Sequence, residues 1–290
     1  MKNTEKSISL EFNSEGTIEI VKMKSTTKKL KKWVIAFLVL TILIIVWSIL
    51  ITMPATNARN FTFIYDEDSL TAVLTSYRGI SRVVEIPSSV EHNGRTYSVT
   101  KIGTAAFFRN RLTCVTIPDS ITEIGSRAFS RNRLTSVTIP DSVARIEMNA
   151  FSINELTNVT FPDSVTSIGI NAFSYNQLTY ITIPDSVTII ESRAFSHNQL
   201  TSVTFPDSIM EIKYGAFSSN QLTSVTIPDS VTSIGGFAFF SNQLTSLTIP
   251  ESVASIGDRA FAHNQLTNVV IPDSVDMGSD VFAGNELLDQ

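Results

Sequence analysis

The feature that most constrains this chain is a motif of 22 residues that recurs from Leu112 onward. Its clearest copy spans residues 222–242 and reads LTSVTIPDSVTSIGGFAFFSN. A period of 20 to 50 residues is typical of solenoids, propellers and arrays, which grow one unit at a time and have no single globular core. The prolines that mark this period are Pro118, Pro140, Pro162, Pro184, Pro206, Pro228, Pro250 and Pro272.

Each repeat predicts one short strand followed by a turn. In Val-Thr-Ile the apolar residues alternate with threonine, which is the period of a half-buried strand, and the β-branched bias agrees. Proline then ends the strand because it has no N–H, and Pro-Asp-Ser supplies the turn. Ile121, Ile124, Ala128 and Phe129 fit neither strict alternation nor a long helix, so we expect a short irregular or 3₁₀ return.

Equivalent positions of successive coils are expected to stack. The phenylalanines would form one aromatic spine, and the asparagines would form a ladder that satisfies backbone groups of a buried turn. The alternative for the ladder, an amide-lined binding channel, is disfavoured because a position shared by every coil serves the fold. The spine is Phe107, Phe129, Phe151, Phe173, Phe195, Phe217, Phe239, Phe261 and Phe282. The ladder is Asn110, Asn132, Asn154, Asn176, Asn198, Asn220, Asn242, Asn264 and Asn285.

The charge of the chain is unevenly distributed. Residues 1–53 hold eight lysines and four glutamates, a net charge of +4, so the remainder carries −9 of a total of −5. An acidic repeat region does not favour nucleic acid, which needs a basic surface. One cysteine, Cys114, and three scattered histidines give neither a disulfide framework nor metal-ligand spacing. We expect no catalytic constellation, no metal and no cofactor.

Residues 33–53 form an uncharged run of 21 residues, WVIAFLVLTILIIVWSILITM. As a helix it would be about 31 Å long, which matches one hydrocarbon core. The lysine-rich tail 1–32 precedes it, so the positive-inside rule predicts a single-pass protein of the cell membrane with a cytoplasmic N-terminus and extracellular repeats. The alternative is a signal peptide that is cleaved near Ala58 and a secreted product.

The remaining boundaries follow from turn signals and from the repeat. Residues 54–60 are expected to be a linker, and 61–79 a capping hairpin that covers the open end of the array. Residues 80–290 would hold nine coils, the first enlarged by an insertion whose Asn93-Gly94 pair predicts a hairpin turn. Leu287-Leu288 would begin a further strand, and its open edge invites edge or end-to-end self-association.

The pattern L-x-x-V-x-I-P-x-S-V-x-x-I-x-x-x-A-F resembles the BspA-like leucine-rich repeat family of bacterial and protist surface proteins. In this chain it covers roughly residues 80–290. The resemblance implies an α/β-type repeat solenoid, right-handed, with parallel strands on its concave face. It also implies a surface-exposed protein that adheres to matrix proteins or to other cells, and it brings no catalytic motif.

Two surfaces are candidates for binding. The first is the outward face of the strands, where one aromatic residue interrupts a surface of serine and threonine: Thr138, Thr160, Tyr180, Thr182, Thr204, Thr226 and Thr248. The second is a basic patch within three consecutive coils: Arg109, Arg111, Arg127, Arg131, Arg133 and Arg145. Both surfaces have an alternative explanation without a ligand. Threonine favours strands and keeps an exposed face soluble, and the arginines could simply form a solvated edge.

Three functions remain open from the sequence. The repeats could form an adhesion scaffold that recognises an extracellular protein or glycan, which exported topology and the resemblance favour. They could instead form a structural or self-associating spacer without a specific ligand, which the monotonous strand face favours. An ice-binding array built on the Ser-x-Thr columns is the least favoured, because Asn158 and Tyr180 interrupt it.

Overall fold

The computed structural model describes residues 9–12, 18–22 and 58–287. Two compact units divide the chain, residues 1–54 and 55–290. In the first unit, β1 (Ser9–Phe12) pairs antiparallel with β2 (Ile18–Lys22). The hydrophobic run 33–53 lies outside the described residues. No helix among the residues that are described is both long enough and apolar enough to span a bilayer.

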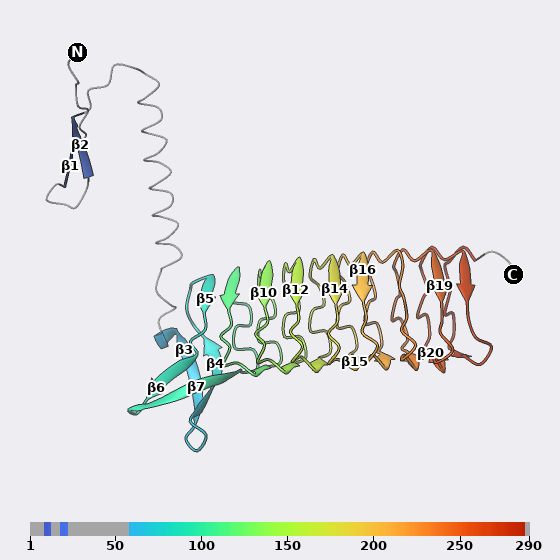
Figure 1. The fold of residues 1–290 in the computed structure, drawn as a ribbon, viewed down its shortest axis with the longest axis horizontal. Helices are drawn as coiled ribbons and strands as arrows, with labels where there is room; N and C mark the ends of the chain where they lie inside the picture. Colours follow the sequence, from blue (N-terminus) through green and yellow to red (C-terminus); the bar gives the residue numbers. More distant parts are fainter. Residues whose placement is uncertain (1–8, 13–17, 23–57, 288–290) are drawn as a thin grey trace, which may run out of the picture. The chain divides into compact units, whose positions relative to one another are not determined.

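The second unit is a solenoid in which two sets of short parallel strands recur along one axis (Figure 1). The first set holds the Val-Thr motif of each repeat. Its members are β5 (Val83–Glu85), β8 (Cys114–Thr116), β10 (Ser136–Thr138), β12 (Asn158–Thr160), β14 (Tyr180–Thr182), β16 (Ser202–Thr204), β19 (Ser246–Thr248) and β21 (Asn268–Val270). We call their outward side the strand face. Residues 224–226, the equivalent segment of one coil, are not in a strand.

A second strand of two residues, such as Glu123–Ile124, lies within the segment for which an irregular or 3₁₀ return was predicted. Turns without regular structure make up the rest of that return, so the prediction is confirmed in part. The second set is β9 (Glu123–Ile124), β11 (Arg145–Ile146), β13 (Ser167–Ile168), β15 (Ile189–Ile190), β17 (Glu211–Ile212), β18 (Ser233–Ile234), β20 (Ser255–Ile256) and β22 (Asp276–Met277). Among the described residues the one 3₁₀ helix, η1 (Ala58–Asn60), precedes the coils.

The second set, not the first, builds the continuous sheet of the molecule. It runs from β22 back to β9 and on into the N-terminal strands as one 12-stranded sheet, the long sheet, whereas the first set is hydrogen-bonded in separate pairs. Proline limits the length of the first ladders, because Pro118 and its equivalents have no N–H with which to extend them. The long sheet is extended on both sides, by bonds such as Thr122 N–H to the Thr100 carbonyl and Gly125 N–H to the Ile102 carbonyl.

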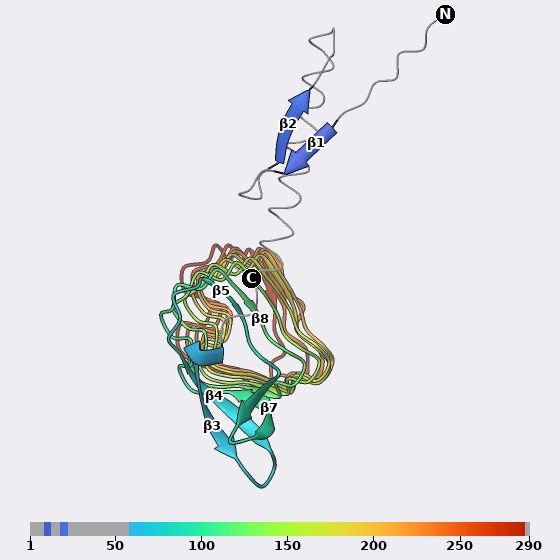
Figure 2. The ribbon, with the colours of Figure 1, turned by 90° about the vertical axis from the view of Figure 1, so that its left-hand side faces the viewer.

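A cap of two antiparallel pairs, joined by one parallel pairing, begins the solenoid. β3 (Phe61–Asp66) pairs with β4 (Thr71–Tyr77), which pairs in parallel with β7 (Arg95–Ile102), the first strand to join the coils. β6 (Ser89–His92) pairs with β7 through the two-residue turn Asn93-Gly94, whose φ values of 51° and 73° confirm the predicted hairpin turn. In the view down the array, these strands project from the ring of stacked coils (Figure 2).

The phenylalanine spine is confirmed. Successive rings from Phe107 to Phe282 stack with centroids 5.0 to 5.9 Å apart and with planes 6° to 17° from parallel. Phe107 also contacts Tyr77 and Phe61 of the cap, at 5.5 and 6.3 Å. The apolar core is therefore continuous from the cap into the coils, and burial raises the pKa of the Tyr77 phenol.

The asparagine ladder is confirmed as a structural element. Asn176 donates to the carbonyls of Phe151 and Phe173, at 3.0 and 3.1 Å, and accepts from the N–H of Leu156 at 3.1 Å. The same three bonds recur from Asn132 to Asn264, so each buried side chain joins adjacent coils.

Serine of the Pro-Asp-Ser turn also joins coils, which the sequence reading missed. Ser164 Oγ donates to the Val143 carbonyl of the preceding coil at 2.8 Å, and Ser208 Oγ donates to the Val187 carbonyl at 3.0 Å.

Candidate functional site

The strand face carries the first set of predicted contact residues, and all of them are exposed. In β14 the burial pattern is exposed–buried–exposed, so Tyr180 and Thr182 face solvent while Ile181 enters the core. Successive strands stack in register, with Thr182 opposite Thr204. The threonine column is thus continuous along most of the array, although Thr226 lies in the segment that is not in a strand.

Chemically this face offers hydroxyl groups and little else. Tyr180, with 49% of its surface exposed, is the aromatic residue that breaks the column. An open depression of about 400 Å³ lies where Ser224 and Thr226 meet Ser246 and Thr248. The arrangement suits weak hydrogen bonding to an extended polar ligand and provides none of the arginine or tryptophan anchors that dominate tight protein interfaces.

The structure divides the predicted basic patch, although all six arginines are exposed. Arg145 lies on β11 of the long sheet, in register with Glu123 and Ser167. Four others flank two ladder asparagines in adjacent coils. Arg109 and Arg111 surround Asn110, and Arg131 and Arg133 surround Asn132. Main-chain bonds join the two turns, including Arg133 N–H to the Leu112 carbonyl at 2.8 Å.

Arg127 and the four arginines beside the ladder belong to one surface that the sequence reading did not identify, which we call the turn wall. It comprises the exposed residues of each coil between the long sheet and the next strand of the first set, residues 125–133 in the coil of Arg127. Two residues in almost every coil have a left-handed backbone there, such as Arg127 and Arg131 at φ 57° and 60°. Left-handed residues are otherwise mostly glycine or asparagine, but here most are neither. The sequence feature that could have revealed the turn wall is that these positions vary from coil to coil.

Aromatic and cationic side chains gather on the turn wall of the later coils. The rings of Tyr175 and His197 stack at 4.2 Å, and Arg193 lies over the Tyr214 ring at 5.0 Å. Phe237 contacts Tyr214 at 5.4 Å. Partial burial, followed by the charge of Arg193, lowers the pKa of His197.

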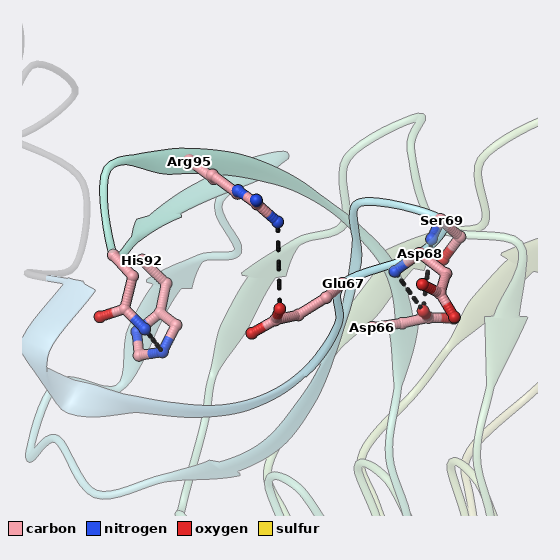
Figure 3. Close-up of polar contacts among 7 residues, drawn as sticks. Asp66, Glu67, Asp68, Ser69, His92 and Arg95 are labelled. Carbon is pink, nitrogen blue, oxygen red and sulfur yellow. Dashed lines mark hydrogen bonds and ion pairs between the residues drawn. The ribbon is translucent and has the colours of Figure 1, made fainter.

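The tip of the β3–β4 hairpin carries acidic residues whose contacts serve the turn, and His92 and Arg95 lie at the tip of the β6–β7 hairpin (Figure 3). Asp66 accepts hydrogen bonds from the N–H groups of Asp68 and Ser69. A hydrogen bond from the Ser69 side chain, followed by those two N–H groups, lowers the pKa of the Asp66 carboxyl group. Arg95 and Glu67 face each other at 3.9 Å, an exposed pair worth little stability. Within the described residues, no cluster of three or more histidine, cysteine or acidic side chains could hold a metal ion.

Comparison with known families matches the repeats to the BspA type leucine-rich repeat region. The match has six copies and covers residues 87–200 and 166–289, which together are more than half of the chain. The chain belongs to this family. The resemblance drawn from the motif is therefore confirmed.

Two solved structures of this kind are similar over most of the chain. A leucine-rich repeat protein from Bacteroides ovatus is 26% identical with a TM-score of 0.61, over 78% of this chain and 67% of that one. A leucine-rich cell surface protein from Faecalibacterium prausnitzii is 28% identical with a TM-score of 0.55, over 80% of this chain and 74% of that one. The search of curated proteins finds no match.

Proposed function

We propose that the protein is a cell-surface scaffold whose repeats bind an extracellular protein or glycan. The observation that carries the proposal is a stiff array with long exposed surfaces, in which every coil is joined to the next by the asparagine ladder and the phenylalanine spine. Such arrays present extended binding surfaces rather than a single enclosed site. Similarity to a cell surface protein from Faecalibacterium prausnitzii supports the location.

In this proposal residues 33–53 anchor the chain in the membrane and the repeats face outward. The uncharged run and the lysines before it support this topology. Mass spectrometry of the N-terminus of the mature protein tests it. A mature chain that begins near Ala58 would replace the anchored form by a secreted one, with the repeats exported in both cases.

Binding is tested with the full chain in nanodiscs, against arrays of extracellular matrix proteins and of glycans. We expect at least one saturable interaction. Thr182→Lys combined with Thr204→Lys places two bulky charges on the strand face and leaves the turn wall intact. If the interaction survives this change, the strand face is not the contact surface. If no matrix protein or glycan binds the unaltered chain, the binding role fails, and a spacer without a specific ligand becomes the better reading.

A further inference from the structure

The turn wall of the early coils carries a compact cationic group, the arginine quartet: Arg109, Arg111, Arg131 and Arg133. The two arginines of one coil lie beside the two of the next, because Arg109 N–H bonds to the Ser130 carbonyl at 3.1 Å and Arg133 N–H bonds to the Leu112 carbonyl at 2.8 Å. Adjacent strands are about 4.8 Å apart, so the quartet forms two close rows of like charge.

Within the described part of the chain, no acidic side chain forms an ion pair with the quartet, although Glu155 lies one coil beyond Arg133. The ion pairs of that part involve other residues, and the Arg109 guanidinium lies 5.1 Å from the centre of the Phe108 ring. Unpaired like charges in register are unfavourable, and the remainder of the chain beyond residue 53 is acidic, at −9. A local positive surface on an acidic body selects a ligand with several negative groups.

The row that begins with Arg111 and Arg133 continues along the same wall as exposed polar residues. Glu155 follows, and then a glutamine occurs in each of the next five coils: Gln177, Gln199, Gln221, Gln243 and Gln265. The main-chain N–H of each glutamine donates to a carbonyl of the previous coil, as Gln177 does to Leu156, and these bonds hold the row in register. Side-chain amides donate and accept, which suits hydroxyl groups.

We propose that this surface binds a sulfated glycan that lies along the solenoid axis. The arginine quartet holds sulfate groups through charge-assisted hydrogen bonds, and the glutamine row contacts sugar hydroxyls. A glycan fits better than an acidic peptide, because this row offers amides and guanidinium groups rather than apolar pockets for side chains. The inference rests on the proposed binding role and names the ligand class and the surface.

The test measures binding of heparin to the full chain in nanodiscs of neutral lipid by surface plasmon resonance. The competitors are desulfated heparin, polyphosphate and polyglutamate. We expect heparin to bind with an affinity that falls as salt increases, and desulfated heparin to bind at least about tenfold more weakly. Polyphosphate or polyglutamate that binds as tightly as heparin would overturn the assignment to a glycan.

The variants use residues that the chain itself places at equivalent positions. Arg109→Ser and Arg131→Ser copy Ser219, and Arg111→Gln and Arg133→Gln copy Gln177. The four changes together should weaken heparin binding by about a hundredfold or more. The matched control, Arg95→Gln with Arg145→Ser, removes two exposed positive charges from other surfaces and should change binding less than threefold, whereas Arg111→Gln with Arg133→Gln should lower it about tenfold.

A variant that should bind more tightly tests whether the glycan extends from the arginine quartet along the glutamine row. Glu155→Gln removes the negative charge between the quartet and the glutamine row, so heparin should bind several-fold more tightly. Unchanged affinity would contradict a ligand that runs along this row, and unchanged binding in the quadruple variant would overturn the site. If the chain still binds a matrix protein while heparin fails, this inference falls and the proposed binding role stands.

Discussion

The strand face and the turn wall belong to the same coils, yet they differ in how much they vary. One outward position of the strand face is threonine from Thr116 to Thr248, with Val270 as the exception. The turn-wall position before the ladder asparagine instead reads Arg109, Arg131, Ile153, Tyr175, His197, Ser219, Ser241 and His263. Strand geometry favours a β-branched residue, whereas the wall position is restricted mainly by its backbone. Side chains on the turn wall can therefore vary to suit a ligand more freely than those on the strand face.

Turn-wall residues lie only one or two positions away from core residues along the chain. The largest expected difference is between the stability effects of a core substitution and of a neighbouring turn-wall substitution. Phe173→Ala removes a fully buried ring from the spine and should lower the free energy of unfolding by about 3–5 kcal/mol. Tyr175→Ala, two residues away on the wall, should cost less than about 1 kcal/mol. Chemical denaturation of the full chain followed by circular dichroism measures both. Equal losses would erase the distinction between wall and core.

A second comparison, between a buried ladder asparagine and the adjacent exposed glutamine, tests the difference between core and turn wall with polar side chains. Asn176→Ala leaves the Leu156 N–H and the carbonyls of Phe151 and Phe173 without that side chain, at a cost of about 2–3 kcal/mol. The adjacent Gln177→Ala, exposed on the wall, should change the stability by no more than about 0.5 kcal/mol. Denaturation midpoints of the two variants decide the matter, and a tolerant Asn176 would mean that water replaces its bonds.

Glycine should have opposite effects on the two exposed surfaces. Ser219 has φ 56° on the wall, so Ser219→Gly relieves left-handed strain and should stabilise the fold by up to about 1 kcal/mol. Ser202→Gly, in strand β16, should destabilise it by about 0.5–1 kcal/mol, since glycine gains more backbone freedom on unfolding. Thermal unfolding of both variants measures the signs. Two changes of the same sign would show that backbone geometry does not distinguish the surfaces.

The smallest expected effect concerns acid sensitivity of the wall. Burial and Arg193 lower the pKa of His197 below the ordinary histidine value of 6.5, so the folded chain disfavours the protonated ring. Its contribution to stability is therefore complete above pH 6.5 and is lost as the pH falls through the lowered value. His197→Ser should flatten this part of the curve of stability against pH. A steeper curve in the variant would contradict the direction of the shift.

Much of the fold was predictable because the same pattern of residues recurs in each coil. The alternation of Val115 and Ile117 placed the first strands, and the recurrence of Phe129 and Asn132 predicted the spine and the ladder. The turn at Asn93-Gly94 followed from local backbone preference. By contrast, the two-residue strand Glu123–Ile124 was missed, because such a strand is too short for a hydrophobic period.

The candidate sites were less predictable, because the arginines that form them occur in only a few coils and do not follow the repeat. Exposure of Thr182 follows from strand alternation, but nothing in the sequence shows that Arg145 joins the long sheet. The left-handed backbone at Arg131 was hidden as well, since arginine has no preference for that conformation.

By itself, the sequence determined that the chain coils every 22 residues, which side chains enter the core and which family it belongs to. These follow from local spacing, which is the same in every coil. The tertiary structure decided which strands form the continuous sheet and which arginines become neighbours. Both depend on the hydrogen bonds between coils, and residues that are 22 positions apart meet only when the chain is wound.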